Sequence, residues 1–209
     1  INGLLINALD LHPFVVTLGT NTIFRGVTLV ISKGSPIFGL PASFKGISGY
    51  VAGFPIPFIF AIVMSCILIW FTNKTVMARN LYALGGNKQA AWYSGINTKK
   101  YTLLAHILAS FLAGIAGVIM TSRVGAAEPT AGEGYETYAI ASCIIGGTSF
   151  FGGKGKIFGV LLGGLTIGTI TNGLNILNVS SYWQKVVMGA LIIASVALEK
   201  LVGSTVKNK

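Results

Sequence analysis

Charged residues are scarce in this chain, at only 10% of its 209 residues. Soluble proteins average about 25% charged residues, so this chain has too few to cover a soluble surface. Its five acidic residues are too few for paired acid–base catalysis, and neither G-x-S-x-G nor H-E-x-x-H occurs. The sequence therefore argues against a soluble enzyme.

Cysteine and histidine are also rare, with two of each. Cys66 and Cys143 lie inside apolar runs, and neither they nor His12 and His106 show metal-ligand spacing. We therefore expect no metal site. The net charge of +10 does not indicate nucleic-acid binding, because the basic residues fall in short loops between apolar runs.

Apolar residues are abundant, at 53% of the chain, with a mean hydropathy of +0.75. A helix of about 20 apolar residues spans the roughly 30 Å of membrane hydrocarbon. The pattern predicts an all-α polytopic transmembrane bundle with about six spans. These are Phe14–Ile31, Ile56–Phe71, Leu103–Thr121, Tyr138–Phe151, Ile157–Leu177 and Trp183–Val202. The fourth is short and contains Gly146 and Gly147, so it is expected to be tilted, broken or partial.

Lysine and arginine predict the orientation, because they concentrate in short cytoplasmic loops. One set of alternate loops and the C-terminal tail hold ten of them: Lys74, Arg79, Lys88, Lys99, Lys100, Lys154, Lys156, Lys200, Lys207 and Lys209. The other set holds four, namely Lys33, Lys45, Arg123 and Lys185. We therefore expect the first set and both ends of the chain to be cytoplasmic.

A polar segment, "ARNLYALGGNKQAAWYSGIN", interrupts the apolar runs within the predicted cytoplasmic loop 72–102. Gly85 and Gly86 are compatible with a sharp turn, and Asn87 suits a helix N-cap. A short helix over Lys88–Ser94 is then expected to end at Gly95 in the left-handed conformation. This helix could lie at the membrane surface or fit a groove on a cytoplasmic partner.

The same segment resembles the coupling loop of the inner-membrane permeases of bacterial monosaccharide ABC importers, ribose importers among them. The blocks "GGTSFFGGKGK" and "NGLNILNVSSYWQ" strengthen the resemblance, which covers nearly the whole chain. It implies an ATPase-coupling role for Asn87, Lys88, Ala90, Ala91, Trp92 and Gly95. It also implies a permease homodimer, a cytoplasmic ATPase that holds ATP and Mg, a periplasmic sugar-binding protein, and a location in the bacterial inner membrane. The permeases of this family have more spans, so several N-terminal spans are expected to be missing. The chain itself is expected to bind no cofactor.

Polar side chains within the spans are candidates for a translocation path: Asn21, Arg25, Thr169, Asn172 and Asn175. Hydroxyl and amide groups can exchange hydrogen bonds with a neutral sugar without holding a charge. Arginine at membrane depth is costly unless it reaches the interface, pairs or faces water. For Arg25, outward snorkelling and a place near an aqueous path both remain open.

Two further sets have structural as well as functional interpretations. Gly155, Gly159, Gly163, Gly164 and Gly168 form small-residue spacings that predict either close helix packing or a surface along which helices slide during transport. Glu128, Glu133 and Glu136 lie in one predicted outside loop and form either a solvated surface or a contact for the binding protein. The "GGTSFFGGKGK" block fails the G-x-x-x-x-G-K-[ST] phosphate-loop pattern and predicts a tight turn instead.

We therefore expect the permease subunit of an importer for ribose or a similar monosaccharide, with no enzymatic activity of its own. A related ABC permease for autoinducer-2 or branched-chain amino acids is one alternative. A secondary transporter is another, although the sequence has no clearly mid-span acidic residue for ion coupling.

Overall fold

The computed structural model describes residues 1–207; Lys209 of the predicted basic tail lies outside them. The chain divides into two compact units. Unit 1 comprises Ile1–Met64 and Lys88–Gly132, and unit 2 comprises Ser65–Asn87 and Glu133–Lys209. One boundary between the units falls within the predicted coupling loop 72–102, and the single transmembrane domain expected over 1–209 stays a prediction.

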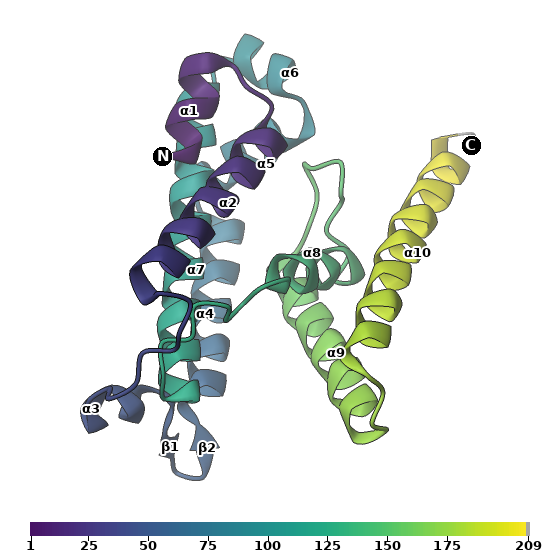
Figure 1. Cartoon of the computed structure of the whole chain (residues 1–209). Coiled ribbons are helices and arrows are strands. Elements are labelled where there is room, and N and C mark those ends of the chain that lie inside the picture. The colour runs from purple at the N-terminus through teal and green to yellow at the C-terminus, as the bar shows by residue number, and fades with distance from the viewer. Residues whose placement is uncertain (208–209) are drawn as a thin grey trace. The chain divides into compact units, whose positions relative to one another are not determined.

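Unit 1 contains long helices and a small region with a short helix and a hairpin (Figure 1). Its elements are α1 (Asn2–Leu9), α2 (Pro13–Ser32), α3 (Ala42–Lys45), the 3-10 helix η1 (Gly46–Ser48), β1 (Tyr50–Val51), β2 (Phe54–Pro55), the first part of α4 (Ile56–Lys74), α6 (Lys88–Tyr93) and α7 (Thr98–Val124). Helix α7 organises this unit, because α1, α3, η1 and α6 all pack against it.

Local sequence explains where α7 begins and ends. The Asn97 side chain accepts a hydrogen bond from the Lys100 amide at 3.0 Å, which caps the first turn. Gly125 ends the helix with a φ of 74°, a conformation that glycine adopts without steric cost. Helix α6 packs near the beginning of α7, and η1 lies near its end, where Ser48 contacts Ser122. The coupling segment and the first predicted outside loop thus lie at opposite ends of α7, as the alternation of loops predicts.

The predicted outside loop contains a short antiparallel hairpin, β1–β2, which the all-α expectation misses. Ala52 and Gly53 form its turn with φ angles of 49° and 82°. Two-residue hairpin turns favour positive φ at both central positions, but alanine there gives a weak sequence signal. This explains why the hairpin is hard to predict from the sequence.

Unit 2 contains the second part of α4 and four further helices: α5 (Val76–Gly86), α8 (Tyr135–Ile145), α9 (Ile157–Ile176) and α10 (Ser181–Lys207). Helix α8 packs against both α9 and α10. The centre of this packing is a small apolar cluster of Ala141, Ile167 and Met188. Unit 2 is therefore a helical assembly held around α8.

The predicted helical membrane fold is confirmed, but the count of six spans is not. Among residues 1–207, four helices are long and apolar enough to cross a membrane: α2, α4, α7 and α9. Helix α10 adds a shorter apolar stretch, Ser181–Ala197. The expected fourth segment, 138–151, is not one long helix, because α8 has only 11 residues and ends at Ile145. Gly147 follows with a φ of 80°, which ends the helical path.

Candidate functional site

The predicted coupling helix exists as α6, which ends one residue earlier than expected, at Tyr93. Gly95 has a φ of 80°, and its amide donates to the Trp92 carbonyl at 3.0 Å. The Ile96 amide donates to the Ala91 carbonyl at 3.0 Å. This is the glycine-terminated helix end that the sequence predicts. The turn expected at Gly85 and Gly86 is wrong, since α5 continues through both.

The two alanines of α6 have different environments. Ala91 is only 4% exposed, whereas Ala90 is exposed. Trp92 and Tyr93 are 63% and 80% exposed, and their rings meet edge to face with centroids 5.0 Å apart. Every residue of α6 except Ala91 is therefore exposed, and its exposed apolar part consists of Ala90, Trp92 and Tyr93. Ala91, expected at the coupling contact, is buried by its own chain.

Helix α1 and the residue after it contact the beginnings of α6 and α7. The Asn7 side-chain amide donates to the Lys99 carbonyl at 2.7 Å. Lys88 Nζ lies 3.8 Å from Asp10 Oδ1, which links the start of α6 to the end of α1. Because both charged side chains are largely exposed, this ion pair adds little stability and mainly restricts position. Sequence reasoning missed Asn7 and Asp10, since neither forms part of a local motif.

On α2, Arg25 hydrogen-bonds to another segment of unit 1. Its Nη1 donates to the Pro129 carbonyl at 3.2 Å, and the side chain is partly buried. This satisfies one guanidinium donor and joins α2 to the loop between α7 and α8. Asn21, one turn earlier, is exposed. The two candidate path residues of α2 therefore lie in different settings.

On α9, Thr169, Asn172 and Asn175 are all exposed residues. The Thr169 hydroxyl donates to the Leu165 carbonyl at 2.8 Å. Asn175 Oδ1 accepts a hydrogen bond of 2.8 Å from Gln184, which is only 7% exposed and also donates to the Val179 carbonyl at 3.0 Å. Asn175 thus joins α9 to α10, and the path role of Thr169, Asn172 and Asn175 stays a prediction.

Replacing Asn175 with alanine is expected to lower the thermal stability of the purified protein, because Gln184 loses an inter-helix partner. Such hydrogen bonds in membrane proteins contribute about 0.6 kcal/mol on average and up to about 1.7 kcal/mol. Asn172→Ala is expected to leave the melting temperature unchanged and to lower uptake. Equal melting temperatures for the two variants would refute the structural role of Asn175.

The predicted outside loops of unit 1 are joined to each other. Ile37 and Ala127 form an antiparallel bridge, with N–H···O distances of 3.0 and 2.9 Å. The buried Ser122 hydroxyl donates to the Phe44 carbonyl at 2.8 Å and accepts from the Ser48 amide at 3.1 Å. These hydrogen bonds therefore hold the first loop against the second loop and against the end of α7. Sequence reasoning missed Ser122, because a serine near the end of a span carries no distinctive signal.

The three acidic residues of the predicted outside loop are divided between the units. Glu128 belongs to unit 1 and accepts a 2.7 Å hydrogen bond from the Thr130 hydroxyl. Glu133 and Glu136 are exposed residues of unit 2, and Glu136 lies in the first turn of α8. A negative charge there is favourable to the helix dipole. Glu136 thus has a structural role beside any contact with a partner.

The five glycines of the predicted stripe lie in different contacts. A Cβ at Gly159 or Gly163 would overlap a backbone carbonyl, that of Gly146 or Ser142. Within the described chain, a Cβ at Gly164 or Gly168 would meet nothing within 4 Å. Gly155 precedes α9 and lies against the side chain of Thr148. Only Gly159 and Gly163 are therefore placed where α8 and α9 approach each other most closely.

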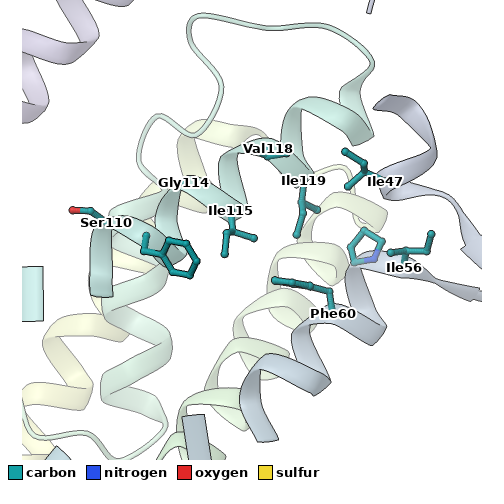
Figure 2. A pocket seen from close by; sticks show the side chains of 10 residues that line it. Ile47, Ile56, Phe60, Ser110, Gly114, Ile115, Val118 and Ile119 are labelled. Atoms are coloured by element: carbon teal, nitrogen blue, oxygen red, sulfur yellow. The ribbon is translucent and has the colours of Figure 1, made fainter. Parts of the chain in front are cut away.

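A cavity of about 510 Å³ lies in unit 1 between the start of α4 and the middle of α7 (Figure 2). Its lining includes Phe60, Phe111, Ile115 and Ile119. Apart from Ser110, the lining side chains are apolar. A sugar needs hydrogen-bond partners for its hydroxyl groups when it leaves water. This cavity is therefore poorly suited to sugar binding, and the polar residues of α2 and α9 remain the better path candidates.

The family described as branched-chain amino acid transport system / permease component matches residues 1–196, and the chain belongs to that family. Together with four apolar helices of spanning length among the described residues, this places the chain in a multi-pass inner-membrane protein of that permease family. No solved structure matches the chain.

Curated relatives match almost the whole chain. It is 57% identical over 203 residues to the D-allose transport system permease protein AlsC of Escherichia coli K12, covering 97% of this chain and 62% of that protein. It is 46% identical over 204 residues to the ribose import permease protein RbsC of Bacillus subtilis 168, covering 95% and 63%. It is 35% identical over 202 residues to the L-arabinose transport system permease protein AraH of E. coli K12, covering 96% and 61%. The chain thus spans about three-fifths of the length of these relatives.

Proposed function

We propose that the chain forms part of the membrane-spanning permease of an ATP-driven importer for ribose, allose or a similar monosaccharide. The observation that carries this proposal is the 57% identity, across 97% of the chain, to a D-allose transport permease. Relatives named for ribose and L-arabinose support a sugar cargo. D-allopyranose has the C2–C4 configuration of D-ribopyranose with an added hydroxymethyl group, so both sugars are reasonable cargoes.

In the proposed cycle, two permease copies form the path and a periplasmic binding protein delivers the sugar to the outside loops. The bridge between Ile37 and Ala127 supports this role, because it holds the two loops together as one docking region. A cytoplasmic ATPase, which holds ATP and Mg, docks on the exposed face of α6. ATP binding and hydrolysis on that partner move α6 and switch the open side of the path. This chain catalyses no covalent step.

Neutral polar side chains suit a path for sugar. Thr169 and Asn172 lie three residues apart on α9 and are exposed in this chain, which places them on one helix face. Their hydroxyl and amide groups can replace water around sugar hydroxyls one at a time, without the strong binding that would trap the cargo. We assign the selective step to the binding protein and the passage to these groups.

Uptake of labelled D-allose and D-ribose tests the proposed function. Cells that express the complete gene with its ATPase and binding protein are compared with a permease-null strain, with unlabelled sugars as competitors. We expect uptake that needs the permease, stops with vanadate and is competed by allose or ribose. Competition by leucine but by neither sugar would favour the amino-acid alternative. Vanadate-insensitive uptake would favour a secondary transporter.

A further inference from the structure

In unit 2 the glycine-rich loop, residues 148–156, packs directly against helix α5. The Tyr82 hydroxyl donates to the Gly155 carbonyl at 3.2 Å. A Cβ at Gly85 would lie 3.0 Å from the Gly153 amide nitrogen, and one at Gly152 would overlap the Gly85 carbonyl. The two segments therefore meet backbone to backbone, with no side chain between them.

The same loop is also fastened to α10. The Phe150 amide donates to Glu199 Oε2 at 3.2 Å, and the Ser149 side chain hydrogen-bonds the same carboxylate. The Ser149 amide donates to the Lys154 carbonyl at 3.0 Å, which closes the loop on itself. Helix α9 begins at Ile157, directly after the loop. One short segment thus connects α5, α9 and α10.

Helix α5 is also the segment that leads into α6. The boundary between the two units falls between Asn87 and Lys88, so α6 belongs to unit 1 and α5 to unit 2. A displacement applied at α6 therefore reaches unit 1 through its packing on α7. It reaches unit 2 through the chain into α5, whose C-terminal end lies against the glycine-rich loop.

We propose that the glycine-rich loop passes displacement of α5 to α9 and α10 during transport, with Gly85 and Tyr82 as positioning residues. This inference rests on the proposed function of the chain as an ATP-driven permease. Closely packed backbone has no rotamers to absorb a shift, and tightly packed interiors transmit strain. Glu199 holds the far side of the loop, so the movement does not end in the loop itself.

Adjacent glycines of α5 give a matched test. A Cβ at Gly85 meets the Gly153 backbone at 3.0 Å, whereas one at Gly86 meets only Gly153 Cα at 3.7 Å, an ordinary contact. The complete transporter, with ATPase and binding protein, is reconstituted into vesicles, and sugar uptake and ATP hydrolysis are measured together. For Gly85→Ala we expect about a tenfold loss of sugar moved per ATP hydrolysed. Gly86→Ala is expected to match the wild type.

Tyr82→Phe supplies a second, milder variant, because it keeps the ring and removes only the hydroxyl that bonds to Gly155. We expect a smaller loss of the uptake-to-hydrolysis ratio in the same direction, and this variant decides the matter if Gly85→Ala fails to assemble. A ratio of uptake to hydrolysis equal to that of the wild type, even if both rates fall, would overturn the proposed transmission of movement through the loop. It would leave the proposed function intact. A wild-type transporter that moves no sugar would overturn the proposed function, and the proposed transmission with it.

Discussion

Gly163→Ala is expected to lower the stability of the protein markedly, whereas Gly164→Ala is expected to preserve or raise it. A Cβ at position 163 would overlap the Ser142 carbonyl of α8 and lie 2.9 Å from the Gly146 amide nitrogen. Because both obstacles are backbone atoms, α8 and α9 must move apart. Overpacking of this kind costs about 1–3 kcal/mol. At position 164 no described atom lies within 4 Å, and alanine favours a helix over glycine by up to about 1 kcal/mol.

Thermal unfolding of the full-length protein in detergent measures this difference. One kcal/mol shifts the melting temperature by roughly 2–4 °C for a protein of 150–250 residues, and by less for a longer chain. We therefore expect Gly163→Ala to melt several degrees below Gly164→Ala. Because the two positions are neighbours in one helix, differences in propensity and membrane depth are small. Identical melting temperatures would mean that α8 and α9 do not approach each other at Gly163.

Ala90→Asp is expected to abolish association with the ATPase while the permease itself remains in the membrane. Ala90 is exposed and lies in the first turn of α6, where an acidic residue is favourable to the helix dipole. The substitution therefore adds a charge to the proposed docking face without weakening the helix. An unpaired charge buried in an interface costs several kcal/mol, and about 2 kcal/mol already lowers affinity roughly thirtyfold. Co-purification of the ATPase and sugar uptake are the measurements.

Ala91→Asp is expected to act differently, through the fold of the permease. Ala91 is buried by its own chain, so the new carboxylate loses its water without gaining a partner. We expect less permease in the membrane as well as less uptake.

Ala90→Ser, a small uncharged change, serves as the control for Ala90→Asp and should retain the ATPase. If Ala90→Asp retained the ATPase and full uptake, α6 would not be the docking helix.

The sequence by itself determined the class of protein and the order of its parts. Scarce charge and long apolar runs require a membrane environment, because a soluble surface cannot be made from them. The polar segment before Asn97 and the stop at Gly95 follow from local chemistry, which is why α6 was predicted within one residue. These are properties of neighbouring residues in the chain, and they need no tertiary contact.

Only the tertiary structure decided which glycines of a repeated pattern lie at a close contact between segments. Gly163 and Gly164 have the same local sequence signal, yet only the first lies against α8. Gly85 satisfies the requirements of a turn, but its actual role is to let the backbone of Gly153 approach a helix. Such contacts depend on segments tens of residues away, and spacing along one helix cannot say which face a distant backbone will meet. Hydropathy sets the helices, and long-range packing sets the close contacts between them.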